Sequence, residues 1–246
     1  MADSMSSVAI VIPALNEETA LPALIENIAT LDPAPNEVIL VDGGSDDQTG
    51  KLARAAGWTV LQSPQPGRGP QVNHGVQSTS GDLVCVLHAD THLPADALSV
   101  IAKTLADDAT ALASFTPRFV GPKGTRWPTT AHNWLKTWYA PLLFRPQLYF
   151  RGVRLLFGDH AMFFRRRHFI QLGGCDERLA IMEDADLCIK FASLGKIRLV
   201  PRFAETSDRR IAKTGRLKSY WTYLNILFLW ARGARERLGE HYPQVR

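Results

Sequence analysis

Short apolar runs alternate with helical patterns through the first half of the sequence, and this alternation limits the possible folds more than any other feature. Short runs rich in leucine or β-branched residues predict buried strands at 7–13, 37–41, 58–62, 82–87 and 111–117. Helices are predicted between them, from about residue 19 and at about 46–56, 71–79 and 95–106. These alternations predict a Rossmann-like α/β fold, with a mostly parallel sheet and helices on both faces.

The pattern changes in the second half of the chain. Residues 117–157 are rich in aromatic residues, prolines and arginines, and we expect a helix followed by irregular structure that lies over the open end of the sheet. Further strands are predicted at 161–164 and 197–201, with one helix ending near Gly173 and another over about 183–194. With 246 residues and no repeat or linker, the chain is predicted to form one domain.

A last helix is predicted from about residue 217. Its residues 220–231 are apolar almost all round, but this stretch is too short to span a bilayer. Two interpretations remain open: a core helix packed on the 117–157 insert, or an interfacial helix lying on an anionic membrane. Trp221, Tyr223 and Trp230 suit the second interpretation, because amphipathic rings favour the headgroup level.

Composition restricts the partners and the compartment. The formal net charge is +4, with the basic excess in the C-terminal half, which fits either a solvated face or an anion-binding role. Cys85, Cys175 and Cys188 are odd in number and widely spaced, which argues against a disulfide framework and predicts a reducing, cytoplasmic compartment. The N-terminus has no basic leader, and no apolar run reaches the roughly 18 residues of a membrane span. We therefore expect a soluble or peripheral protein.

Polar side chains follow two of the predicted strands. His88, Asp90 and His92 come directly after the strand at 82–87, on one face of an extended segment, and Asp42 follows the strand at 37–41. Ligands of open α/β sheets bind at the carboxyl ends of the strands. Asp90 could hold Mg²⁺ or Mn²⁺ that binds a diphosphate, and Asp42 could accept hydrogen bonds from a nucleobase or a ribose. A polar strand exit without function is the plain alternative.

The turns beside these strands have residues suited to ligand binding. Asn16 in "PALNEE" can cap the helix that follows, and Gly43 and Gly44 let the backbone approach a ligand. Arg68 lies between two glycines just before a helix, where an arginine fork and helix N–H groups favour phosphate. This turn is not a G-x-G-x-x-G motif and does not follow the first strand, so a nicotinamide cofactor is disfavoured.

A second group of acids opens the helix predicted over 183–194. Glu183, Asp184 and Asp186 occupy its first turn, where acids complement the helix dipole without any further role. A fold that brings them to Asp42 and Asp90 would instead form a carboxylate cluster, with metal and base roles divided among its members.

Five segments in order resemble family 2 glycosyltransferases of the GT-A fold. They are "VIPALNEE", "EVILVDGGSDDQT", "GRGPQVNHGVQSTSGDLVCVLHADTHLP", "FGDHAMFFRRRHFIQLGGCDE" and "MEDADLCIKFASLGKIRLVP". The resemblance covers roughly residues 7–210. It is nearest to short bacterial members, some of which are labelled arsenosugar-biosynthesis glycosyltransferases. It implies transfer of a sugar from a nucleoside diphosphate sugar to an acceptor hydroxyl, with a nucleotide-sugar-binding half at 1–116, an acceptor-side half at 117–205 and a basic tail at 206–246.

Carried over residue by residue, the resemblance implies a donor site and a metal site. The residues expected around the nucleotide sugar are Pro13, Ala14, Glu17, Asp42, Gly44, Arg68, His88, Ala89 and Asp90. Asp90 matches the last carboxylate of the family's D-x-D motif and would reach a divalent cation, Mn²⁺ or Mg²⁺. His88 stands where the first aspartate is usual, and a neutral imidazole ligates Mn²⁺ better than Mg²⁺.

The resemblance also implies the catalytic and acceptor-side residues. Asp184 matches the base that takes the acceptor proton in a single displacement with inversion, and Glu183 is its neighbour. The residues expected on the acceptor side are Asp159, His160, Arg209 and Arg210. His160 and Ile211 depart from the family's pattern at positions where glutamine and tryptophan are common. The acceptor is expected to be a small molecule or a lipid-linked hydroxyl, with peripheral membrane contact through the C-terminal helix and no nucleic-acid partner.

Three other classes of protein fit parts of the sequence. A metal-dependent hydrolase would use His88, Asp90 and His92, but the remaining histidines show no metal-like spacing. A nucleotidyltransferase should have a glycine-rich basic loop where this chain has "PALNEE". A catalytically silent nucleotide-sugar-binding protein would have no use for Asp184 besides Asp90.

Overall fold

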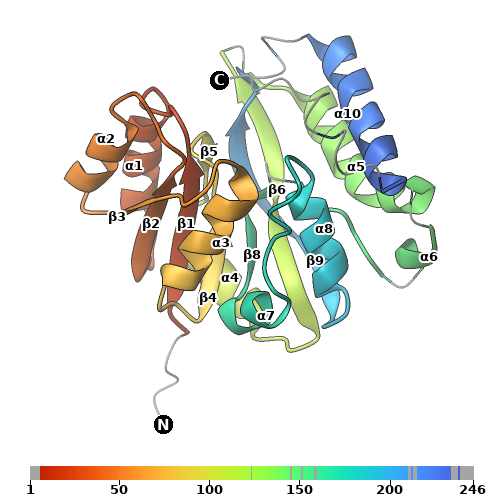
Figure 1. The fold of residues 1–246 in the computed structure, drawn as a ribbon, viewed down its shortest axis with the longest axis horizontal. Coiled ribbons are helices and arrows are strands. Elements are labelled where there is room, and N and C mark those ends of the chain that lie inside the picture. Colours follow the sequence, from red (N-terminus) through yellow and green to blue (C-terminus); the bar gives the residue numbers. More distant parts are fainter. Residues whose placement is uncertain are drawn as a thin grey trace.

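The computed structural model describes residues 6–122, 124–144, 146–150, 152–157, 160–209, 212, 215–233 and 238. A twisted sheet forms its centre, with helices on both faces (Figure 1). The strands are β1 (Val8–Ala14), β2 (Glu37–Asp42), β3 (Thr59–Gln62), β4 (Leu83–Val86), β5 (Thr91–His92), β6 (Thr110–Gly121), β7 (Gly124–Thr125), β8 (Met162–Arg165) and β9 (Lys196–Ser207). The helices are α1 (Leu21–Ala29), α2 (Thr49–Ala55), α3 (Arg68–Ser78), α4 (Ala97–Leu105), α5 (Trp127–Phe144), α6 (Pro146–Tyr149), α7 (Arg166–Gln171), α8 (Glu183–Phe191) and α10 (Arg216–Ala231).

The strand order is β3-β2-β1-β4-β8-β6-β9-β5, with β7 paired to β6. The first four strands along the chain pair in parallel, as do β6 and β9. The expected α/β fold is confirmed. Three of the described strands pair antiparallel: β5 with β9, β7 with β6, and β8 with both β4 and β6. Through these pairings β8 joins the two parallel groups. The sheet therefore includes strands from both halves of the sequence.

The core lies on both faces of this sheet, because successive side chains of a strand point to opposite faces. In β1, Val11 packs in the cluster beneath α3 and α8, whereas Ile10 and Ile12 pack in the cluster beneath α1 and α4. All three side chains are fully buried. Central strands buried on both faces read as continuous apolar runs, which is why these strands were predictable.

The last helix, α10, packs against α5 (Figure 1). Ile226, Leu227 and Trp230 on its inner side are buried in the core cluster. Trp221 and Phe228 on its outer side are exposed. The helix therefore packs on the core and presents aromatic rings outward at the same time. Among the described residues, no helix combines the length and the apolar character that crossing a bilayer requires.

All three cysteines are free and buried. Burial raises the pKa of the Cys85 thiol to about 12, and it raises the pKa values of Cys175 and Cys188 as well. Because the thiolate is the nucleophile, we expect iodoacetamide to label none of them in the native protein near neutral pH. Mass spectrometry should find three labelled cysteines once urea unfolds the chain, and rapid labelling of the native protein would contradict the burial.

Candidate active site

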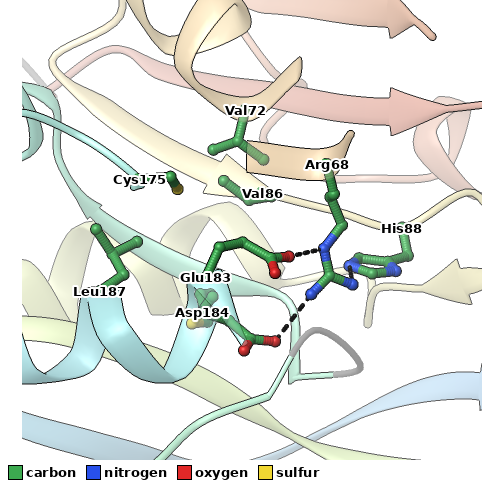
Figure 2. A pocket seen from close by; sticks show the side chains of 9 residues that line it. Arg68, Val72, Val86, His88, Cys175, Glu183, Asp184 and Leu187 are labelled. Atoms are coloured by element: carbon green, nitrogen blue, oxygen red, sulfur yellow. Dashed lines mark hydrogen bonds and ion pairs between the residues drawn. The ribbon is translucent and has the colours of Figure 1, made fainter. Parts of the chain in front are cut away.

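An arginine at the start of α3 contacts two acids at the start of α8 (Figure 2). Nε of Arg68 donates to Oε1 of Glu183, and its Nη2 donates to Oδ2 of Asp184 across 3.0 Å. Its Nη1 lies 3.3 Å from Nε2 of His88, which must accept because a guanidinium has only donors. These side chains line one pocket together with Val72, Val86, Met162, Cys175 and Leu187.

Local sequence explains why the two acids lie side by side. The helix α8 begins at Glu183, directly after Met182, which has a left-handed φ of 74°. The first turn of a helix favours negative charge, and Oδ1 of Asp184 accepts from the backbone N–H of Ala185 across 2.7 Å. Glu183 and Asp184 are only 3% and 6% exposed. Neighbouring buried carboxylates need a cation, and Arg68 supplies it.

A second arginine, from the C-terminal part of the chain, joins two acids of the first half. Nη2 of Arg209 donates to Oε1 of Glu17 across 2.6 Å, and its Nε lies 3.0 Å from Oδ2 of Asp90. The hydrogen bond to Glu17 and the charge of Asp90 raise the pKa of Arg209, despite its partial burial. The backbone N–H of Ser207, at the end of β9, donates to the carbonyl of Asp90. Arg209, expected on the acceptor side, therefore contacts two residues expected around the donor.

Asp42 is a buried carboxylate held by hydrogen bonds at the end of β2. Its Oδ1 accepts from the N–H of Gly44, the N–H of Ser45 and the hydroxyl of Ser45, and its Oδ2 accepts from Gln62. Burial alone would raise the pKa of the Asp42 carboxyl, but the hydrogen bonds from Ser45, Gln62 and Gly44 outweigh it and lower the pKa. Asp42 is therefore ionised at neutral pH, with its position fixed by its neighbours.

Asp42→Asn should destabilise the protein at neutral pH and by less in acid. A carboxyl whose folded pKa lies below its ordinary value of 3.8 adds stability above that pH, and loses it as the pH falls through the folded pKa. Urea unfolding at pH 7 and below pH 4 measures the difference between the two proteins. Asp46→Asn, an exposed acid in the same turn, is the control and should change stability little at either pH. An equal loss at both pH values would contradict the assignment.

The β1 and β2 loops are tied together beside Asp42. The N–H of Asn16 donates to Oγ of Ser45 across 2.9 Å, and Oδ1 of Asn16 accepts from the N–H of Asp46. The expectation that Asn16 caps α1 was wrong, because Ala20 takes that position and makes no side-chain cap. Asn16 has a φ of 54°, a region that asparagine adopts more readily than most residues.

Contacts thus follow one another along the carboxyl edge of the sheet. Asp42 contacts Ser45, which contacts Asn16, and the next residue, Glu17, contacts Arg209 and through it Asp90. His88, two residues before Asp90, leads through Arg68 to Glu183 and Asp184. The structure therefore brings acids at 17, 42, 90, 183 and 184 to one edge of one sheet.

Several other residues expected around the donor have small or partly buried side chains. Ala14 and Ala89 are buried in the cluster beneath α1 and α4, and Pro13 is half-buried in β1. Gly44 has a φ of 95°, which favours glycine, and a Cβ on Gly43 would lie 2.9 Å from Nε2 of Gln71. The turn after β2 therefore keeps its backbone close to the carboxyl edge.

Of the other residues expected on the acceptor side, the structure describes only His160. His160 is fully buried, with Nδ1 lying 2.9 Å from the carbonyl oxygen and 3.1 Å from the backbone N of Phe157, and Nε2 lying 3.4 Å from Oγ1 of Thr137 in α5. It contacts the interior side of α5. Asp159 and Arg210 lie outside the described residues.

Two buried polar residues that support the site were not predicted. Nε2 of Gln71 in α3 donates to the carbonyls of Ala14 and Val41, and so fastens the ends of β1 and β2. Oγ1 of Thr49 accepts from the N–H of Glu17 across 2.8 Å. The one signal in the sequence was a polar residue on the buried face of each helix, which does not reveal its partner.

A divalent cation fits this edge as a site shared with a phosphate group. Within the described part of the chain, no three His, Cys, Asp or Glu side chains are grouped to hold a metal ion by themselves. Oε2 of Glu17 is buried and has no hydrogen-bond partner among these residues, and Asp90 is its neighbour across Arg209. Hard cations are often held by one or two carboxylates plus substrate phosphates. Asp90 suits that arrangement, whereas the contact between His88 and Arg68 argues against a zinc hydrolase site.

The sequence matches Glycosyl transferase family 2 over residues 9–173, which is more than half of the chain. The chain belongs to this family. It is 34% identical to an uncharacterized glycosyltransferase of Mycobacterium tuberculosis over 125 residues, 51% of this chain and 54% of that protein. It is 36% identical over 102 residues, 37% of this chain and 31% of that protein, to an undecaprenyl-phosphate 4-deoxy-4-formamido-L-arabinose transferase of Yersinia enterocolitica. The matches thus span about half or less of these relatives.

The fold is similar to those of solved glycosyltransferases. A mannosyltransferase from Pyrobaculum calidifontis, in complex with GDP-Man and Mn²⁺, matches with a TM-score of 0.66 and 20% identity over 96% of this chain and 70% of that chain. Glucosyl-3-phosphoglycerate synthase from Mycobacterium tuberculosis, in complex with Mn²⁺, UDP and phosphoglyceric acid, matches with a TM-score of 0.63 and 22% identity over 93% of this chain and 79% of that chain. The expected GT-A fold is confirmed.

Proposed function

We propose that this protein transfers a sugar from a nucleoside diphosphate sugar to an acceptor hydroxyl, with inversion at the anomeric carbon. The observation that carries the proposal is the adjacency, at one sheet edge, of two arginine-bridged carboxylate pairs. Arg209 joins Glu17 and Asp90, and Arg68 joins Glu183 and Asp184. Acids and cations at this edge suit a reaction in which a diphosphate leaves and a hydroxyl loses a proton.

The donor is proposed to lie along the ends of β1, β2 and β4. Asp42, ionised and fixed by Ser45, would accept hydrogen bonds from the base or the ribose. Arg68 and Arg209 would donate to the diphosphate, because a planar guanidinium forms charge-assisted hydrogen bonds with phosphate oxygens. Mn²⁺ or Mg²⁺ held by Asp90 together with the diphosphate would supply positive charge that offsets the charge of the leaving group. Two solved glycosyltransferases of similar fold support a nucleotide-sugar donor: one is in complex with GDP-Man and the other with UDP.

The chemical step proposed is one displacement. The acceptor oxygen forms a bond to the anomeric carbon as the bond from that carbon to the diphosphate oxygen breaks, and Asp184 takes the acceptor proton. Glu183 shares Arg68 with Asp184 and would orient the guanidinium between base and diphosphate. Burial of Asp184 among Val86, Met162 and Leu187 limits access of water to the base.

The acceptor is proposed to reach the cleft from the side of α5. A pocket of about 420 Å³ lies there, lined by Thr116, Trp127, Thr130, Ala131, Trp134, Pro201 and Phe203. The strand β9 runs from Phe203 in this pocket to Ser207, whose N–H donates to Asp90. Four residues of strand span about 13 Å. An acceptor with an apolar part in this pocket could therefore present a hydroxyl to Asp184, and one relative named for undecaprenyl phosphate makes a lipid-linked acceptor part of the proposal.

Thermal unfolding with a panel of nucleoside diphosphate sugars, with Mn²⁺ and with EDTA, tests the donor. A ligand at 100 times its dissociation constant adds about 2.7 kcal/mol, which is a rise of several degrees in melting temperature for a chain of this size. The best donor is then assayed for release of nucleoside diphosphate. Donor binding without release would favour a silent binding protein, and no stabilisation by any sugar nucleotide would contradict the proposal. We also propose that the protein is located in the cytoplasm.

A further inference from the structure

The helix α5 has its polar residues inside and its apolar residues outside. Thr130, Asn133 and Thr137 are buried, and the helix packs against β6. Oγ1 of Thr130 accepts from the N–H of Phe119 in β6 across 3.1 Å, and Nδ2 of Asn133 is buried with no hydrogen-bond partner among the described residues. A surface helix in water normally has the opposite polarity, because buried polar groups cost free energy.

The outer side of α5 is apolar along its whole length. Its exposed large side chains are Trp127, Trp134, Leu135, Trp138, Leu142 and Leu143. Phe150 follows just after α6, and Trp221 and Phe228 lie on the outer side of the neighbouring helix α10. We call these nine residues the aromatic face. Soluble monomers rarely expose so many large apolar side chains on adjacent elements, which marks an interaction surface.

The chain segments that form this face have no acidic residue. Residues 109–158 contain seven Lys and Arg and no Asp or Glu, and residues 209–235 likewise contain seven and none. These two segments hold half of the 28 Lys and Arg in the chain. Arg118, Arg126 and Arg209 of these segments pair with acids elsewhere in the chain. The helices that carry the aromatic face, α5 in the first segment and α10 in the second, contain basic residues and no acidic residue.

Basic and aromatic side chains are interleaved on the face itself. The guanidinium of Arg154 lies 4.7 Å from the ring centre of Trp138 and 4.6 Å from that of Tyr149. The guanidinium of Arg232 lies 4.0 Å from the ring centre of Phe228. Amphipathic rings with cations beside them suit the headgroup level of a bilayer, where the rings enter the acyl boundary and the cations meet anionic headgroups.

We propose that the aromatic face docks this protein on an anionic phospholipid membrane, with α5 and α10 lying in the interface. The occupant is an anionic membrane rather than a second copy, because pairing two such faces would bring the cations beside the rings, Arg154 and Arg232, toward the same cations of the other copy, and neither segment has an acidic residue to offset them. Six of the nine residues of the aromatic face lie on α5, so this helix provides most of the exposed apolar side chains. The inference does not depend on the transfer reaction, and docking is measurable without any sugar donor.

Cosedimentation with vesicles tests the proposal. Vesicles of equimolar phosphatidylglycerol and phosphatidylcholine should bind the protein at low salt, and vesicles of phosphatidylcholine alone should bind it at least tenfold more weakly, since each basic residue near an anionic surface favours binding. Added salt should weaken binding, because it screens the exposed charges. Brominated lipids should quench tryptophan fluorescence, because Trp127, Trp134, Trp138 and Trp221, four of the six tryptophans, lie on the aromatic face.

A matched pair of variants separates docking from misfolding. Leu135→Gln with Leu142→Gln removes two outer leucines of α5 and should weaken vesicle binding about tenfold or more, since burial of each leucine contributes. Ile170→Gln on α7 is the control, because Ile170 is 46% exposed, close to the 51% of Leu135, but lies outside the aromatic face. Both proteins should keep the melting temperature of the unsubstituted chain. Equal vesicle binding by the two proteins, binding without quenching, or a dimer that the double substitution abolishes would overturn the proposal.

Discussion

Asp184→Asn is expected to abolish most sugar transfer and to leave donor binding in place. Removal of a general base costs about 100- to 10,000-fold in rate. Asparagine has nearly the shape of aspartate and can still accept from Arg68 and from the backbone of Ala185, so the first turn of α8 should persist. Steady-state kinetics with the donor found by thermal unfolding should show the loss in kcat, with little change in the donor KM.

Asp186→Asn is the matched control for this prediction. It removes an acid from the same turn of α8 that contacts Lys190 rather than Arg68. Transfer should stay close to that of the unsubstituted protein. If Asp186→Asn lost as much activity as Asp184→Asn, the loss would come from the charge or stability of the helix, and Asp184 would not be the base.

Asp90→Asn is expected to remove the metal dependence of donor binding. A metal ion stabilises the charge of a leaving group by several kcal/mol, and each 1.36 kcal/mol corresponds to a factor of ten in rate, so kcat/KM should fall about 100-fold or more. In the unsubstituted protein the sugar nucleotide should raise the melting temperature more with Mn²⁺ than with EDTA. In Asp90→Asn the two rises should be equal.

Asp96→Asn provides the comparison for Asp90. Asp96 also pairs with an arginine, Arg202, across 2.5 Å, but it lies on the surface and outside the cleft. Its loss should leave Mn²⁺ dependence and transfer unchanged. A full Mn²⁺ effect that survives in Asp90→Asn would show that the cation, if bound, is held by other residues.

The strands and helices of the first half were predictable because local pattern determines them. Residues of β1, β2 and β4 are buried on both faces of the sheet and so form uninterrupted apolar runs. The position of β8 was not predictable in the same way. Its pairing with β4 and β6 depends on contacts between residues that are far apart along the chain, such as Cys85 with Phe163. No local pattern of four apolar residues distinguishes a parallel strand from an antiparallel one.

The acids of the site could be proposed from the sequence, but their cations could not be assigned. Asp42, Asp90 and Asp184 stand at strand ends or in a first helical turn, which are local features. Arg68 is 115 residues from Glu183, and Arg209 is 192 residues from Glu17. Only the fold shows that Arg209 contacts residues on the donor side. The polarity of α5 was hidden for the same reason, since only the position of β6 defines which side of this helix is inside.

A crystal structure with the stabilising sugar nucleotide and Mn²⁺ tests the central claim most directly. The claim is that the carboxyl edge of the sheet forms one donor cleft between the Asp42 turn and the Asp184 helix. We expect the base or ribose against Asp42, the diphosphate near Arg68, Arg209 and Asp90, and the sugar facing Asp184. A nucleotide bound elsewhere, or bound here with its sugar directed away from Asp184, would contradict it.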